Sequence, residues 1–223
     1  MRLDELVSWL DGVLKTGDFS DVSNNGVQIA RSDMGCEAKK VAFGVDASAA
    51  FIKEAAAWGA ELAVVHHGIS WGGGIQRISG GVYNVVKAAI DGDVALYAAH
   101  LPLDAHPVLG NNAQLAKELG LSSVSPAFVY HGETIGLVGT APDGRKIGVV
   151  SGGAGEFAEE AKRLGCDEFV TGEASWGDVI AAENAGMKMR ILGHYESETG
   201  GVRALAKEMA EKLGIETRFF PRA

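Results

Sequence analysis

The sequence predicts an α/β protein built from two similar, duplicated α/β domains with mainly parallel sheets and a cleft between them. Two observations carry this prediction. Short β-branched runs alternate with alanine-rich helical stretches, and the same succession occurs twice along the 223 residues. Strands that alternate with helices imply parallel strands joined by right-handed crossovers. Two related halves packed together would bring their equivalent loops to a shared cleft.

Each copy of the repeat has the same parts in the same order: a strand, a helix that ends at glycine, a second strand, a Ser-Trp-Gly turn, and a histidine followed four residues later by a carboxylate. In the first copy these parts are 41–45, 49–58 with Gly59, 61–65, 70–72, and His100 with Asp104. In the second copy they are 147–150, 156–164 with Gly165, 167–170, 175–177, and His194 with Glu198. A glycine just past a helix supplies the left-handed C-terminal conformation. A helix carrying Leu-Ala-Lys-Glu closes each copy, at 115–118 and at 205–208.

The domain junction is expected near Ser125-Pro126. Residues 1–125 would form an N-terminal α/β domain with the His-His and His-x3-Asp motifs, and 126–223 a C-terminal α/β domain with the His-x3-Glu motif. An amphipathic helix is expected directly after Met1. A hairpin-like stretch is expected around 141–144, where Pro-Asp-Gly is a turn signal.

Composition and charge disfavour several classes of protein. The net charge of −9 gives a long-range field of the wrong sign for nucleic acid or an anionic membrane. No apolar run has the length of a signal peptide or a membrane span, and Cys36 and Cys166 lack metal-ligand spacing. We therefore expect a cytoplasmic protein with reduced thiols. No nucleophile-elbow or dinucleotide fingerprint is present, which disfavours serine hydrolases and dehydrogenases.

Candidate metal ligands lie where predicted strands give way to loops. They are His66, His67, His100, Asp104, His194 and Glu198. Histidine and carboxylate donors suit divalent metals, and the carboxyl ends of strands are where α/β sheets place their chemistry. The sequence therefore predicts a metal site in the cleft.

Each of these groups also has a structural interpretation. Neighbouring residues on a strand point to opposite faces, so His66 and His67 would be one core and one surface residue unless the chain turns at Gly68. If it turns, both rings reach one cleft, which suits two metal ions.

Pro102 argues against a helix after His100, so that loop would wrap back and let Asp104 bridge two cations. Asp104 and Glu198 could instead cap helices.

Other candidates are weaker. His106 and His131 lie in polar stretches and are expected to be exposed to solvent. Gly72-Gly73-Gly74 lacks the lysine of a P-loop, so a flexible loop is expected there.

Four segments carry a resemblance to a known family. They are Asn25-Gly26-Val27-Gln28, His66-His67-Gly68-Ile69-Ser70-Trp71, His100-Leu101-Pro102-Leu103-Asp104 and Gly193-His194-Tyr195-Glu196-Ser197-Glu198. With these the chain resembles the Nif-three-like dinuclear-metal family, whose bacterial members are often labelled GTP cyclohydrolase I type 2 homologues. It departs from the family pattern at Leu101-Pro102, where Thr-Asn is common, and at 171–177, which lacks a histidine.

The resemblance implies a toroidal homohexamer of two-domain α/β subunits, each holding two divalent metal ions that face the internal cavity. By matching motif, the metal ligands would be His66, His67, Asp104, His194 and Glu198. His100 would sit beside the metals as an extra ligand or a proton carrier, and is the one candidate catalytic residue. Zn, Fe, Mn, Co and Ni all suit such a set.

Two functions follow as hypotheses. The first is a metal-dependent hydrolase acting on a cyclic amidine or phosphoester bond of a nucleotide or other small molecule, with Asp104 and Glu198 bridging the ions and His100 as acid or base. The alternative is a noncatalytic metal-binding protein, either a hexameric adaptor or a metal storage or delivery protein. A regulator acting on DNA is disfavoured by the charge and by the absence of a basic stripe.

Overall fold

The computed structural model describes residues 1–222, which divide by their internal contacts into two compact units. The N-terminal unit comprises Met1–Leu103 and the segment that begins at Val202, and the C-terminal unit comprises Asp104–Gly201. Each unit holds one five-stranded sheet. Five of the eight strand pairings are parallel, so the predicted fold of two α/β domains with mainly parallel sheets is confirmed.

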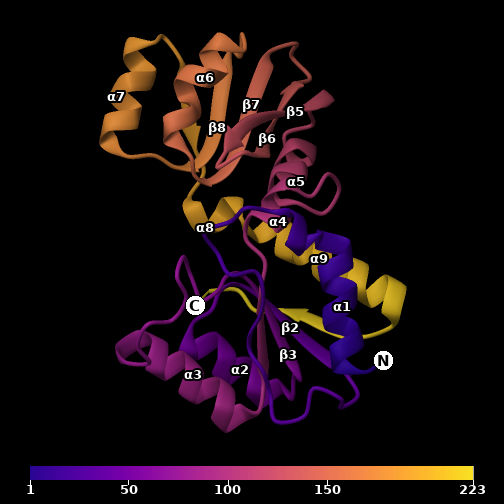
Figure 1. The fold of residues 1–223 in the computed structure, drawn as a ribbon. Helices are drawn as coiled ribbons and strands as arrows, with labels where there is room; N and C mark the ends of the chain where they lie inside the picture. The colour runs from indigo at the N-terminus through magenta and orange to yellow at the C-terminus, as the bar shows by residue number, and fades with distance from the viewer. Residues whose placement is uncertain (223) are drawn as a thin grey trace. The chain divides into compact units, whose positions relative to one another are not determined.

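The sheet of the N-terminal unit has the strand order β1-β4-β3-β2-β10 and is parallel except where β1 pairs with β4. Its strands are β1 Gly26–Ile29, β2 Lys40–Asp46, β3 Leu62–His67, β4 Ala95–Ala98 and β10 Glu216–Phe219. The helices that accompany it are α1 Leu3–Leu14, a 3-10 turn Thr16–Asp18, α2 Ala49–Trp58, α3 Gly80–Gly92, α4 Leu101–Ala105 and α9 Thr199–Leu213. Helices α2 and α3 cover one face of this sheet, and α1 and α9 lie on the other (Figure 1).

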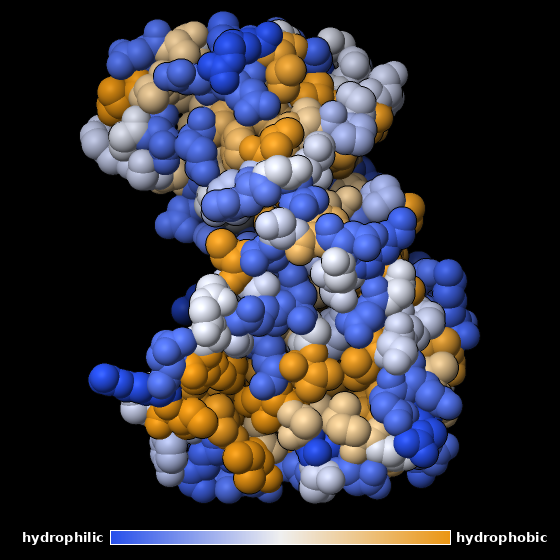
Figure 2. Space-filling view, in the orientation of Figure 1, coloured by the Kyte–Doolittle hydropathy of each residue, from blue (hydrophilic) through white to orange (hydrophobic). Residues whose placement is uncertain are grey.

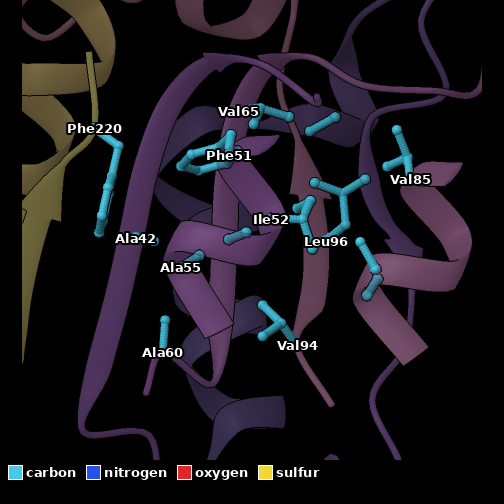
Figure 3. Packing of buried hydrophobic residues seen from close by; sticks show 14 residues of the cluster. Ala42, Phe51, Ile52, Ala55, Ala60, Val65, Val85, Val94, Leu96 and Phe220 are labelled. Atoms are coloured by element: carbon cyan, nitrogen blue, oxygen red, sulfur yellow. The ribbon is translucent and has the colours of Figure 1, made fainter. Parts of the chain in front are cut away.

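Both faces of the central strands are buried, which explains why they read as continuous apolar runs. On one face, alternate side chains such as Ala42, Val65 and Leu96 pack against Phe51 and Ile52 of α2 (Figure 3). Each of these five residues is at most 7% exposed. With its core closed on both faces, the sheet leaves the carboxyl ends of its strands as the place where polar side chains gather.

The sheet of the C-terminal unit has the strand order β5-β6-β7-β8-β9, with β7, β8 and β9 parallel. Its strands are β5 Ser122–Tyr130, β6 Glu133–Thr140, β7 Lys146–Gly153, β8 Glu168–Glu173 and β9 Lys188–Ile191. Its helices are α5 Asn111–Glu118, a 3-10 turn Gly155–Phe157, α6 Ala158–Arg163, α7 Trp176–Asn184 and α8 His194–Ser197. Within residues 1–222, no helix is both long enough and apolar enough to pass through a membrane.

The predicted repeat is visible as one succession of elements in each unit. Strands and helices alternate as β2-α2-β3-α3-β4 in the N-terminal unit and as β7-α6-β8-α7-β9 in the C-terminal unit. The expected hairpin is also present, because Ala141 N donates to Arg145 O at 2.8 Å and joins β6 to β7.

The division of the chain differs from the expected junction near Ser125-Pro126. Helix α5 packs on β6 and β7, so the segment from Asp104 to 125 belongs to the C-terminal unit. At the other end, β10 pairs in parallel with β2, so the last residues return to the N-terminal unit. The chain therefore crosses between the units twice, whereas one crossing was expected.

The segment after His100 is a second correction. Pro102 was expected to prevent a helix, but Leu101–Ala105 forms the short helix α4. Pro102 lies in its first turn, where the missing N–H of proline breaks no helical hydrogen bond. Asp104 therefore stands on a helix rather than on a loop that wraps back.

Candidate metal centre

Three histidines meet at the carboxyl edge of the sheet in the N-terminal unit. His66 and His67 end β3, and His100 follows β4, which pairs with β3 in parallel through Val65 and Ala98. The ring centroids lie 4.5 Å apart for His66 and His67, 5.1 Å for His66 and His100, and 5.8 Å for His67 and His100. One potential ligand atom from each residue lies within 4.8 Å of the other two. The group can therefore present three imidazole nitrogens to one point.

Each of these rings is oriented by an oxygen at Nδ1. His66 Nδ1 donates to Ala99 O at 3.0 Å, and His67 Nδ1 lies 3.0 Å from Asp46 Oδ1. His100 Nδ1 lies 2.9 Å from Asp21 Oδ1. A neutral ring that donates from Nδ1 carries its lone pair on Nε2, and histidine ligands in proteins are commonly held in this way.

Asp21 was not among the site residues predicted from the sequence. Its side chain is 2% exposed and also accepts hydrogen bonds from Leu101 N at 2.9 Å and Asn25 Nδ2 at 2.9 Å. Burial alone would raise the pKa of this carboxyl. Hydrogen bonds from His100, Ser23 N and Asn25 outweigh that effect and lower the pKa to about 2. Asp21 is therefore a fixed negative charge behind His100.

The turn after His67 depends on Gly68. A Cβ at Gly68 would lie 2.2 Å from Oε1 of Gln28, whose carboxamide accepts from Ile69 N at 2.6 Å and Ser70 N at 3.0 Å. A larger residue at this position would displace the Gln28 carboxamide from these two hydrogen bonds. Beside this bend the rings of His66 and His67 lie 4.5 Å apart, centroid to centroid, as expected of a turn at Gly68.

The C-terminal unit holds the candidate carboxylates. Asp104 is 7% exposed and Glu198 is 2% exposed, and one carboxylate oxygen from each lies within 4.8 Å of the other. Asp104 Oδ1 accepts hydrogen bonds from Asn111 Nδ2 at 2.8 Å and Ser151 Oγ at 3.0 Å. It does not cap α5, whose N-cap is Gly110, whereas Glu198 does lie just before α9.

His194 lies between two carboxylates of the same unit. Its Nε2 is 3.3 Å from Glu198 Oε1, and its Nδ1 is 2.7 Å from Glu173 Oε2 at the end of β8. The hydrogen bond and charge of Glu198, assisted by Glu173, raise the pKa of His194 to about 9 against the opposing effect of burial. Without a metal, the imidazolium is thus the cation that balances these carboxylates.

Gly152 makes room for Glu198. It has φ +67, and a Cβ there would lie 2.5 Å from Glu198 Oε1. Its N–H donates to Ser197 Oγ at 3.0 Å, which ties the end of β7 to the segment that carries Glu198.

Two of the sequence candidates stand apart from both groups. His106 accepts hydrogen bonds at Nδ1 from Val108 N and Leu109 N, so it shapes its own turn and is half-buried rather than exposed. His131 is exposed and follows β5 in the hairpin to β6.

The donor set in each unit fits a divalent metal ion. Two buried carboxylates within 4.8 Å of one another repel, and a cation between them removes that cost. Imidazoles whose Nδ1 is held by an oxygen direct Nε2 outward as a ligand. The carboxylate oxygens and imidazole nitrogens of these residues are therefore suitable ligands for a divalent metal ion.

Comparison with known proteins gives the family. The model of the Duf34/NIF3 (NGG1p interacting factor 3) family matches residues 1–145 and 134–222. The chain belongs to this family. The resemblance drawn from the histidine motifs is thus confirmed.

Relatives in this family are similar along nearly their whole length. A GTP cyclohydrolase 1 type 2 homolog of Halobacterium salinarum is 39% identical over 250 residues, covering 98% of this chain and 97% of its own. The protein of the same name from Escherichia coli K12 is 32% identical over 243 residues, with coverage of 98% and 97%. Among solved structures, protein ybgI, described as of unknown function, superposes with a TM-score of 0.91 at 31% identity, covering 100% of this chain and 99% of its own.

Proposed function

We propose that the protein binds two divalent metal ions and uses them to hydrolyse a bond in a nucleotide or related small molecule. The proposed ligands are His66, His67, Asp104, His194 and Glu198. The pair of buried carboxylates, Asp104 and Glu198, carries this proposal, because a buried like-charged pair is stable when cations lie against it. Zn, Fe, Mn, Co and Ni all accept such a mixture of imidazole and carboxylate ligands.

Two bound divalent ions would supply Lewis acidity and lower the pKa of a bound water. Asp104 and Glu198 would hold the ions together with His66, His67 and His194. Asp104 is fixed for this role by Asn111 and Ser151, and Glu198 by the space that Gly152 leaves.

His100 is proposed to move the proton. Its Nδ1 is held by the ionised Asp21, so its Nε2 can accept a proton from the attacking water and return it to the leaving atom. The Asp21 carboxylate stabilises the imidazolium that this transfer creates. The same geometry serves the opening of a cyclic amidine and the cleavage of a phosphoester.

The substrate class rests on the names of the relatives. Proteins 32–39% identical to this chain are called GTP cyclohydrolase 1 type 2 homologs, which favours a purine nucleotide or a molecule derived from one. The net charge of −9 disfavours a polymer of nucleotides as the substrate.

Replacement of Glu198 by glutamine tests the function. Glu198→Gln is expected to lose metal and all hydrolysis of a nucleotide panel, whereas Glu54→Gln, on the exposed surface of α2, keeps both. Unchanged metal content in Glu198→Gln would contradict the ligand assignment. Full metal content in the wild type with no turnover on any nucleotide would contradict the hydrolase and favour a metal storage, delivery or adaptor role.

We also propose, from the family resemblance, that the protein assembles as a toroidal homohexamer in the cytoplasm. An exposed edge strand supports self-association: β5 lies at the edge of its sheet, with Val124 at 41% and Val129 at 56% exposure. Light scattering after size exclusion measures the mass of the assembly, and a monomer would contradict this part of the proposal.

A further inference from the structure

A pocket in the N-terminal unit lies beside the histidine group and contains none of the proposed metal ligands. Its volume is about 510 Å³, within the range of about 300–1,000 Å³ typical of small-molecule sites. It is bounded by the segment after β2, the turn after β3 and the first turns of α3. Hydrophobic residues gather over α2 and α3 on the face seen in Figure 2.

A backbone hydrogen bond and the side chain of Trp71 connect the wall of the pocket to the histidine group. Ala47, in its wall, follows Asp46, and Ala47 N donates to His67 O at 2.8 Å. The indole of Trp71, also in the wall, lies 6.1 Å from the His67 ring and 5.2 Å from the His100 ring, centroid to centroid. The indole of Trp71 therefore borders both the pocket and the histidine group.

The lining selects a flat, largely apolar group with polar edges. Ile69, Val82 and Val85 supply aliphatic surface, and Trp71 supplies an aromatic ring that is 38% exposed. Trp71 Nε1 donates to Gly68 O at 3.1 Å, which holds the indole in place. Asn84 adds an amide that can both donate and accept hydrogen bonds. Aromatic rings pack well against such a wall, and ring nitrogens and carbonyls pair with such an amide.

We propose that this pocket binds the nitrogen heteroaromatic ring of the substrate, with the purine class as its occupant, while the reacting part of the molecule lies at the histidines. The inference rests on the proposed function for the statement that the occupant is the substrate. Binding of the ring itself involves no metal ligand, so it persists in metal-free protein.

Gly81 allows the pocket to be filled without disturbing the fold. It lies in the first turn of α3 and lines the pocket, and a Cβ there would meet no atom within 4 Å. Gly12 in α1 is a matched control, since it is also helical and a Cβ there also meets nothing within 4 Å. Leucine at either position removes the helix penalty of glycine, so both variants are expected to fold.

Calorimetric titration of the full chain with inosine tests the proposal, because this purine nucleoside has no phosphate to chelate metal. Inosine is expected to bind wild type and Gly12→Leu alike, with and without metal, and ribose is expected not to bind. Affinity is expected to fall by about tenfold or more in Gly81→Leu and in Trp71→Leu. No binding of inosine to wild type, or equal affinity in Gly81→Leu, would overturn the proposal.

Metal content measured in the same samples separates this inference from the proposed function. Inosine binding by a protein that takes up no metal would contradict the proposed metal centre, but it would still support the binding of a purine ring in this pocket. Two metals per chain without inosine binding would overturn only the proposal that this pocket binds a purine ring.

Discussion

His100 Nδ1 lies 2.9 Å from Asp21 Oδ1, although 79 residues separate them in the sequence. The same carboxylate accepts a hydrogen bond from Leu101 N, so Asp21 fixes both the ring and the backbone beside it. Asn25 adds to this arrangement by accepting from His100 N at 2.8 Å through Oδ1. The segment before β1 thus supplies the groups that position a histidine at the end of β4.

Asp21→Asn is expected to weaken the orientation of His100, because it removes the charge that favours a proton on Nδ1. Long-range ¹H–¹⁵N NMR of the metal-free protein should show His100 protonated at Nδ1 in wild type and a mixture of ring forms in the variant. Hydrolysis by the metal-loaded variant is expected to fall about 10–100-fold. Asp18→Asn, at an exposed position, is the control, and an unchanged His100 spectrum in Asp21→Asn would refute the positioning role.

Asp46→Ala is expected to lower metal affinity about 10–100-fold, because Asp46 orients His67 through Nδ1. Competition with a chromogenic chelator measures this affinity. Asp91→Ala is the control, since Asp91 is exposed and pairs with Lys87 on the same helix. Equal affinities in the two variants would show that Asp46 does not support a ligand.

Gly152→Ala and Gly165→Ala separate backbone strain from the carboxylate site. Both glycines have positive φ, +67 and +76, so alanine costs about 1–2 kcal/mol of unfolding free energy at either position. Only at Gly152 would the new Cβ displace Glu198. Urea unfolding should therefore show destabilisation in both variants, with metal lost in Gly152→Ala alone. Full metal content in Gly152→Ala would argue against Glu198 as a ligand.

Asp93 gives an acid-dependent contribution to stability away from the metal centre. Hydrogen bonds from Ser32 N and from Arg31 lower the pKa of Asp93 to about 2. Because the folded pKa lies below the unfolded value of 3.8, the stabilisation is present above about pH 4 and is lost as the pH falls toward 2.

Asp93→Asn tests this contribution without straining the backbone, because asparagine tolerates the φ of +48 at this position. Urea unfolding should show the variant to be less stable than wild type near pH 7, with the difference shrinking as the pH approaches 2. A difference that does not change with pH would contradict the assigned cause.

Elements set by local signals could be predicted from the sequence. The helix Ala49–Trp58 was predicted with its correct bounds, because Gly59, with φ +82, ends it and Ser48 caps it by accepting from Phe51 N at 3.1 Å. The strand-end histidines were found in the same way, since a polar residue that interrupts an apolar run is visible in any window of the sequence.

Features that depend on distant contacts could not be predicted. The unit boundary is set by the pairing of β10 with β2 and by the packing of α5 on β7, and neither leaves a periodic signal. The carboxylates that orient the histidines come from other segments of the chain. Asp46 and Glu173 each end a strand, a signal that could have identified them, whereas Asp21 lies before β1 and carries none.

Metal content per chain, measured on protein purified without a histidine tag, decides whether the protein holds a metal centre. We expect about two divalent ions per chain in wild type and fewer in His66→Ala, because His66 is fully buried beside His67 and His100. No metal in either protein, even after reconstitution with each candidate ion, would mean that the histidines and carboxylates are structural.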